Sequence, residues 1–159
     1  MDLPLELPKE LHYLGVAKDS KMLLEMLSSL PPDLITFFES ACEDTPWCMK
    51  HSDFIKGIIR WITIRSFEEK LSMDFAHRAA GAIRKNFSVL RQHLYRDLIF
   101  EVDGKQIEQN SLLWATTSDY FHTHIRIECR EKNSSKISME GMTYEIFEQI
   151  QEFVETGDV

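Results

Sequence analysis

A change of pattern at Arg96-Asp97 divides this chain into two regions that must fold differently. Before it, apolar residues recur at helical spacing, and Pro and Gly fall mainly where helices would end. After it, two segments rich in β-forming residues flank Asp103-Gly104, which is a favoured two-residue hairpin turn. The sequence therefore predicts an α+β protein, with an all-helical domain at 1–95 and a second domain of short strands and helices at 96–159.

The first region predicts a succession of helices. Segments 9–14 and 19–30, each followed by Gly or Pro, are expected to be the first two. Ser52 can cap a later helix, whose apolar stripe we expect to be buried: Phe54, Ile55, Ile58, Ile59 and Ile62. Ser66-Phe67-Glu68-Glu69 matches a capping box and predicts a helix of about seven turns that continues to Leu94.

The second region mixes strands with helices. After the hairpin, the pattern predicts two short helical turns over 111–121 and a short strand over 136–139. A helix is expected over 143–155, ended by Gly157. This helix would present one apolar side, made of Ile146, Ile150, Phe153 and Val154.

Charge restricts the classes of partner. The chain has 26 Asp and Glu residues against 18 Lys and Arg residues, which gives a formal charge of -8. Nucleic acids and anionic lipid surfaces are bound through Lys and Arg, so this balance disfavours both. The most apolar stretch is also interrupted by Lys56 and Arg60, and it is too short to span a membrane. We therefore expect protein partners.

The three cysteines predict a reducing compartment such as the cytosol, because Cys42, Cys48 and Cys129 cannot all pair internally. Neither Cys48-x-x-His51 with Cys42 nor His122-Thr123-His124 with Cys129 has the paired spacing of known zinc sites. A catalytic cysteine remains an alternative, since the residues that activate such a cysteine come together only in the folded structure. No local catalytic signature surrounds these three cysteines. We predict no metal, no cofactor and no enzymatic activity.

Four segments of the second region carry motifs in a fixed order. The first, Asp97 to Ile107, is a hairpin with an Asp before its apolar strand, and the second, Leu112 to Phe121, ends in Ser118-Asp119-Tyr120-Phe121. A strand and helix at 137–147 and then Phe153-Val154-Glu155-Thr156-Gly157 follow. Together they resemble the BTB/POZ domain family, over well under half of the chain. The helical first region resembles no family.

The resemblance has departures. Asn110 stands where the family usually has His, Ser111 where it has a basic residue, and Glu155 where it has an aromatic residue. Family members normally continue beyond the position of Val159 into a further pair of helices. We therefore expect the BTB/POZ-like domain to be truncated here or to be completed differently.

The resemblance implies a protein that dimerises, oligomerises, or holds a cullin-3 scaffold so that substrates are presented to a ubiquitin ligase. In cullin-binding members a hydrophobic-x-Glu motif follows the Tyr-Phe pair, and Cys129-Arg130-Glu131 stands at that interval. The partner-binding residues implied are Asp97, Tyr120, Phe121, Cys129 and Glu131.

Alternatives to an adaptor for a cullin-3 ubiquitin ligase remain. Segment 128–136 can equally be a polar loop without a partner. The domain can self-associate, through an apolar helix face and the hairpin edge, without recruiting a ligase. The family is also expanded in bacteria that live inside eukaryotic cells, so an effector acting in a host cytosol is a further alternative.

Overall fold

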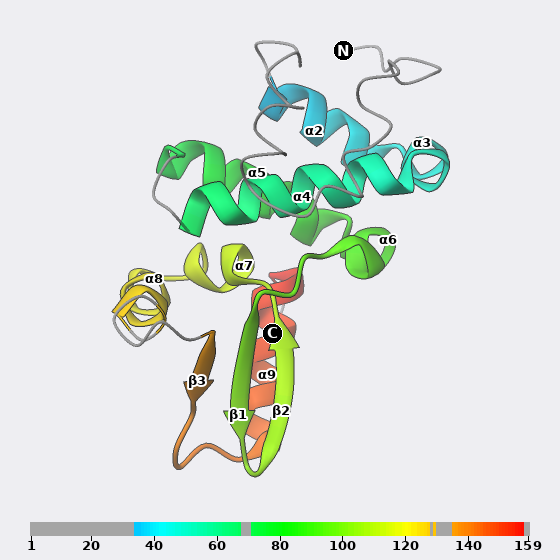
Figure 1. Ribbon diagram of the computed structural model, residues 1–159. Coiled ribbons are helices and arrows are strands. Elements are labelled where there is room, and N and C mark those ends of the chain that lie inside the picture. The colour runs from blue at the N-terminus through cyan, green and yellow to red at the C-terminus, as the bar shows by residue number, and fades with distance from the viewer. Residues whose placement is uncertain (1–33, 68–70, 128, 130–134, 158–159) are drawn as a thin grey trace. The chain divides into compact units, whose positions relative to one another are not determined.

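The computed structural model describes residues 34–67, 71–127, 129 and 135–157 of the 159-residue chain. The helices predicted over 9–14 and 19–30 lie outside these residues. The chain divides into two compact units between Leu94 and Tyr95, shown in Figure 1. The α+β prediction is confirmed: helices dominate, and the second unit contains a small mixed sheet. No helix in the described part of the chain is long and apolar enough to cross a membrane.

The described part of the first unit is helical. Its elements are α2 (Leu34–Glu43), α3 (Thr45–Lys50), α4 (Ser52–Phe67), α5 (Met73–Lys85), α6 (Phe87–Leu90) and a 3-10 helix, η3 (Arg91–His93). The predicted apolar stripe of α4 is confirmed as core, because all five of its members are at most 1% exposed. Helix α4 begins at Ser52, but the Ser52 hydroxyl bonds to Nε2 of His93, 3.1 Å away, instead of capping the helix.

The long helix predicted from Ser66 to Leu94 is wrong. Ser66 lies inside the last turn of α4, and the next helix begins later, where the Ser72 hydroxyl accepts a hydrogen bond from the Phe75 N–H. That helix, α5, ends at Asn86, whose side-chain amide donates to the Ala82 carbonyl. Asn competes with the helical backbone through such local bonds, so it breaks a run that the apolar spacing alone would continue.

The second unit begins with the predicted hairpin, β1 (Leu98–Val102) and β2 (Lys105–Gln109). Asp103 and Gly104 both have positive φ, at 52° and 78°, as a tight hairpin turn requires. There follow α7 (Ser111–Ala115), α8 (Asp119–Arg126), β3 (Lys136–Ser138) and α9 (Tyr144–Thr156). The sheet order is β2-β1-β3, with β2 antiparallel and β3 parallel to the central β1.

Aromatic rings fill the core of the second unit. Phe100 from β1 and Trp114 from α7 have ring centroids 4.5 Å apart, and Trp114 stacks on Phe147 of α9 at 5.4 Å. Trp114 is fully buried, and its indole N–H donates to the Gln109 side chain at 3.0 Å. Helix α9 therefore covers one face of the sheet, as Figure 1 shows.

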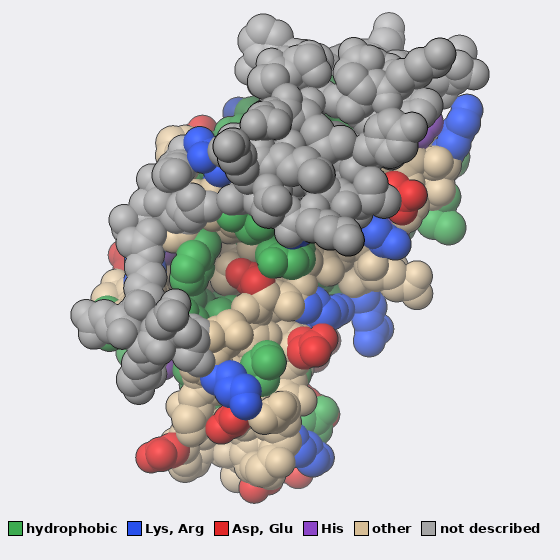
Figure 2. All heavy atoms as spheres, viewed as in Figure 1, with side chains coloured by type: hydrophobic (Ala, Val, Ile, Leu, Met, Phe, Trp, Pro, Cys, Tyr) green, Lys and Arg blue, Asp and Glu red, His purple; other side chains and the backbone are tan. Residues whose placement is uncertain are grey.

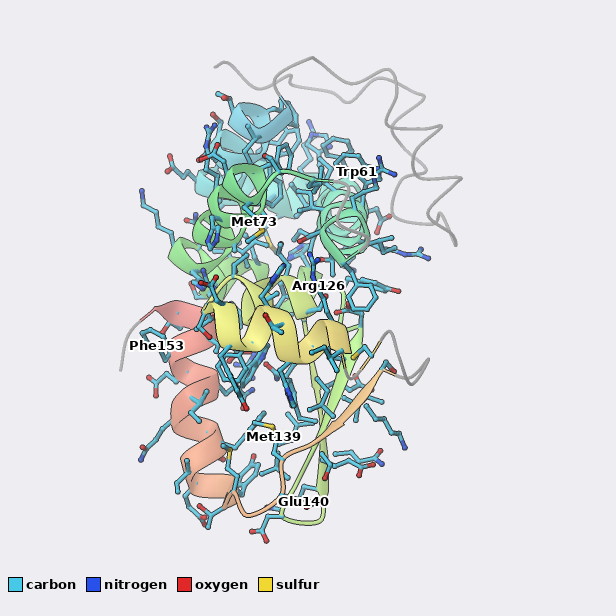
Figure 3. The ribbon with its side chains drawn as sticks, turned by 90° about the vertical axis from the view of Figure 1, so that its left-hand side faces the viewer. Trp61, Met73, Arg126, Met139, Glu140 and Phe153 are labelled. Carbon is cyan, nitrogen blue, oxygen red and sulfur yellow. The ribbon has the colours of Figure 1, made fainter. Side chains whose placement is uncertain are left out.

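Helix α9 has the predicted ends but a different buried face. The Thr143 hydroxyl caps its start, and Gly157, with φ of 80°, ends it in the left-handed conformation. The buried side chains are Phe147 and Val154, whereas Ile146 is 50% and Phe153 is 40% exposed. Figure 3 shows Phe153 on the side of α9 that is turned away from the strands. Of the four residues predicted for the apolar side, only Val154 is therefore buried, and Ile150 is half-buried.

Candidate partner-binding surface

Helix α8 is oriented by two residues of the Ser-x-Tyr-Phe motif. The Ser118 hydroxyl accepts a hydrogen bond from the Phe121 N–H at 3.3 Å and so fixes where the helix begins. Phe121 packs edge-on against Trp114 with ring centroids 5.1 Å apart. On the same side of the helix, Ile125 is 1% exposed. One face of α8 is thus anchored to the aromatic core.

The opposite face carries apolar and aromatic groups that face solvent. Tyr120 is 68% and Ile127 is 49% exposed, and the ring of His124 stacks on Tyr120 at 5.6 Å. These three residues follow one another at the i, i+4, i+7 spacing of a single helical stripe. We call Tyr120, His124 and Ile127 the α8 surface. Exposed aromatic residues with a polar tip are typical anchors of protein interfaces.

Cys129 comes after the α8 surface in the sequence, but it is buried. Its side chain is only 6% exposed, so it belongs to the core of the unit. Glu131, the other end of the predicted hydrophobic-x-Glu motif, lies outside the described residues. The structure therefore places Tyr120 on a surface, and it places Phe121 and Cys129 mainly beneath that surface.

Asp97 is half-buried and immediately precedes β1. Its carboxylate accepts hydrogen bonds from the Ser111 N–H at 2.8 Å and from the Ser111 hydroxyl at 2.6 Å. Withdrawal from water raises the pKa of Asp97 above its ordinary value, while the two bonds from Ser111 act to lower it. These bonds join the start of the hairpin to the start of α7.

Asn110 has a similar linking role. It caps α7 through its side-chain oxygen, which accepts from the Leu113 N–H, and its amide donates to the Tyr95 carbonyl at 2.7 Å. Asn110 and Ser111 stand at positions where the sequence departs from the family pattern, so pattern matching gave them no role. His124 and Ile127 were also missed, although their spacing from Tyr120 was a readable signal.

The cysteines and histidines form no metal centre in the part of the chain that the structure describes, where no three suitable ligands gather. Burial raises the pKa of Cys48 to about 11 and that of Cys42 further still. The Cys48 thiol also donates to the Ala41 carbonyl at 2.8 Å. These two thiols are therefore held protonated near neutral pH, which disfavours either as a nucleophile.

Comparison with known proteins identifies the second region. The family model for the BTB/POZ domain matches residues 87–159. The match begins at the first residue of α6, so it includes the helical turns before the hairpin. No curated protein and no solved structure matches the chain. BTB/POZ domains are generally protein-interaction modules without catalytic activity. Residues 87–159 of this chain are a BTB/POZ domain, and a helical region precedes them.

Proposed function

We propose that this protein is an adaptor that binds other proteins through its BTB/POZ domain, with the α8 surface as the contact. The observation that carries the proposal is the exposure of Tyr120 and Ile127 on a helix whose other face is fixed to the core. Because the helix is already fixed, its backbone loses little additional freedom on binding, which favours affinity. Exposed apolar side chains gathered on one face mark interaction sites more often than scattered ones do.

The finer proposal is that one partner is the cullin-3 scaffold. Its basis is the resemblance, which puts the contact on α8 and on the Cys129-Arg130-Glu131 segment that follows. Because Cys129 is buried, Tyr120 and Ile127 would supply the apolar contact, and Glu131 would supply the charge. Phe121 and Asp97 would act indirectly, by holding α8 and α7 in position.

The test is a calorimetric titration of the full chain against the N-terminal domain of cullin-3. Tyr120→Ala should weaken binding by about ten-fold or more, the usual effect of losing an aromatic anchor. Glu131→Ala should also weaken it. The matched control is Phe153→Ala, which removes another exposed aromatic ring of the same unit from a different helix. Equal losses in Tyr120→Ala and Phe153→Ala, with folding intact by circular dichroism, would contradict the use of α8.

A second candidate function is self-association without a ligase. It is favoured by the exposed side of α9, where Ile146 and Phe153 give apolar area outside the α8 surface. Light scattering of the full chain distinguishes the two. A dimer that Phe153→Glu dissociates, together with no binding of cullin-3, would replace the adaptor proposal. A monomer that binds cullin-3 would remove this alternative.

A further inference from the structure

Residues 87–94 belong to one region by sequence and to the other by packing. The BTB/POZ family model matches the chain from Phe87 onward, whereas the division into compact units falls after Leu94. Helix α6 and η3 therefore lie in the matched domain but pack within the helical unit. The contacts that hold this segment are thus contacts between the helical region and the first residues of the domain.

Two buried side chains hold the segment in the helical unit. Leu90 of α6 is fully buried, and His93 of η3 is only 7% exposed. The Nε2 atom of His93 lies 3.1 Å from the hydroxyl oxygen of Ser52, the first residue of α4. Because a helix of four residues is not stable by itself, α6 depends on such tertiary contacts.

The surroundings of His93 oppose a positive charge on its ring. Burial lowers the pKa of His93, and the ammonium of Lys56, one helical turn after Ser52 on α4, lowers it further. The Val89 carbonyl of α6 acts in the opposite direction and is outweighed. Helix α6 carries no titratable side chain, and on η3 itself Arg91 is exposed and also positive. The held segment therefore favours the neutral imidazole.

Release of the segment removes this opposition to protonation. An exposed imidazole has a pKa of about 6.5, so the released form takes up a proton more readily than the held form does. The ratio of released to held molecules should therefore rise as the pH falls from 7.5 to 5.5. Its limit, reached where the held ring takes up no proton, is about a ten-fold rise.

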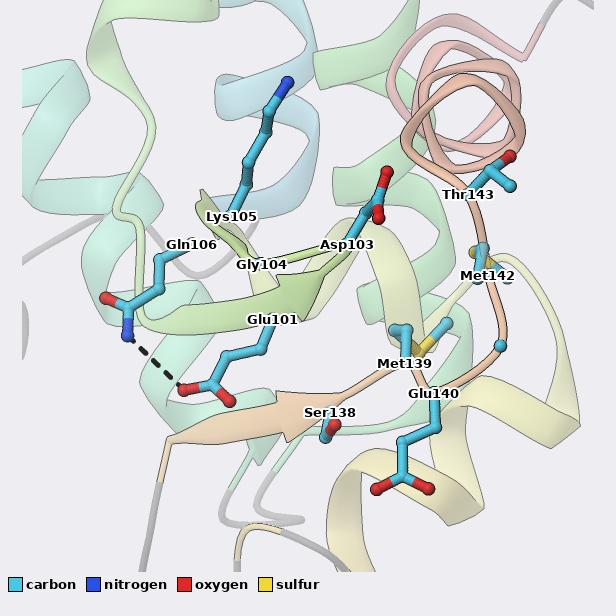
Figure 4. Close-up of a pocket in the computed structure, with 11 residues that line it drawn as sticks. Glu101, Asp103, Gly104, Lys105, Gln106, Ser138, Met139, Glu140, Met142 and Thr143 are labelled. Carbon is cyan, nitrogen blue, oxygen red and sulfur yellow. Dashed lines mark hydrogen bonds between the residues drawn. The ribbon is translucent and has the colours of Figure 1, made fainter.

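The acidic groove of the second unit offers no comparable response. It measures about 650 Å³ and lies between the hairpin turn and the start of α9, where Glu101, Asp103 and Glu140 line it, as Figure 4 shows. Asp103 and Glu140 are exposed, and Figure 2 shows further acidic side chains around the lower end of this unit. Water and salt screen exposed charges, and protonation of Asp103 or Glu140 breaks none of the described contacts between elements.

We propose that His93 acts as a proton-sensitive latch, which holds residues 87–94 against α4 while its ring is neutral and releases them when the ring is protonated. The latch consists of His93 and Ser52, with Lys56 as the charge that sets its response. It lies where the helical region holds the first residues of the domain. No residue of the α8 surface takes part, so the latch is independent of the proposed adaptor function.

The test is amide hydrogen exchange of the full chain at pH 7.5 and 5.5, followed by NMR and expressed as protection factors, which remove the intrinsic effect of pH on exchange. The reporting amides are those of Val89 and Leu90, which donate to the Asn86 carbonyl at 3.1 and 3.0 Å. We expect their protection to fall by up to about ten-fold at the lower pH. At both pH values it should be lower than that of residues 54–62 in α4 and insensitive to low urea, because release is a local opening.

Reversal of one charge separates the latch from a general effect of acid. Lys56→Glu places a negative charge beside the ring, so the held form should accept the proton and the loss of protection at pH 5.5 should disappear. Lys56 is exposed, so this variant should fold. The matched control is Lys50→Glu, which makes the same change at an exposed site of α3 and should keep the loss.

His93→Gln keeps a side chain that can bond to Ser52 but cannot take up a proton, so its protection at Leu90 should no longer depend on pH. Equal behaviour of Lys56→Glu and Lys50→Glu would overturn the proposal. Equal protection of Leu90 and the α4 core at both pH values would also overturn it, because the segment would then open only when the whole unit unfolds. Tyr120→Ala should leave the response unchanged, which separates this test from that of the α8 surface.

Discussion

The pair formed by Asp97 and Ser111 allows one stability prediction to be worked out fully. The Ser111 hydroxyl donates to the Asp97 carboxylate at 2.6 Å, and the Ser111 N–H donates to the same group at 2.8 Å. Ser111→Ala removes the hydroxyl bond and keeps the backbone bond. The carboxylate, which is partly withdrawn from water, then has one hydrogen-bond donor fewer.

The magnitude follows from the charge of the acceptor. Hydrogen bonds to charged groups contribute roughly 1.5–3 kcal/mol, about twice the value for neutral pairs. We expect Ser111→Ala to lower the free energy of unfolding of the second unit by about 2 kcal/mol at neutral pH. Ser138→Ala is the matched control, because its hydroxyl is exposed and makes none of the described bonds. Its effect should stay within about 0.5 kcal/mol.

The assay must observe the second unit by itself, because tryptophans occur in both units. Amide hydrogen exchange of β1, measured by mass spectrometry across a urea series, meets this need. Asp97→Asn in the Ser111→Ala background completes a double-mutant cycle that isolates the pairwise energy. A loss in Ser111→Ala no larger than that in Ser138→Ala would refute the assignment of the bond as a stabilising contact.

Three further predictions concern the first unit. Cys48, with its pKa raised to about 11, should react with iodoacetamide at pH 7.5 far more slowly than free cysteine; reaction at the free rate would contradict its burial. Ile59→Ala should cost about 2–5 kcal/mol in urea unfolding, since Ile59 is fully buried, and a loss below 1 kcal/mol would contradict that role. Burial, aided by Lys56, lowers the pKa of His93 below 6.5, so an unfolded chain binds the proton better. Stability should therefore fall as pH drops below about 6.5, and His93→Gln should flatten that part of the profile.

Features encoded by neighbouring residues were predicted well. The hairpin needed only two positive φ angles, which Asp103-Gly104 accommodates, and β-forming residues on both sides. The Thr143 cap and the Gly157 end of α9 are local in the same way. The core stripe of α4 followed from spacing, because all five of its apolar residues fall on one side of a single helix.

Features that depend on distant packing were predicted poorly. In α9 the apolar residues span more than one side of the helix, so spacing could not decide whether Phe147 or Ile146 faces the sheet; the contact of Phe147 with Trp114 decides it. Ser66 has the residues of a capping box, but it lies in the last turn of α4. The hydrophobic-x-Glu motif likewise describes only neighbouring residues, so it could not reveal that packing buries Cys129.

The orientation of Tyr120 shows how a local motif and a distant contact combine. Adjacent residues of a helix point about 100° apart, so a helix that turns Phe121 to the core turns Tyr120 away from it. Ser118 determines where the helix starts, and Trp114 provides the surface against which Phe121 packs. Replacing Phe121 would remove the contact with Trp114 that sets the orientation of α8. The exposure of the α8 surface would then change. The exposure of Tyr120 therefore depends on the anchor beside it as much as on Tyr120 itself.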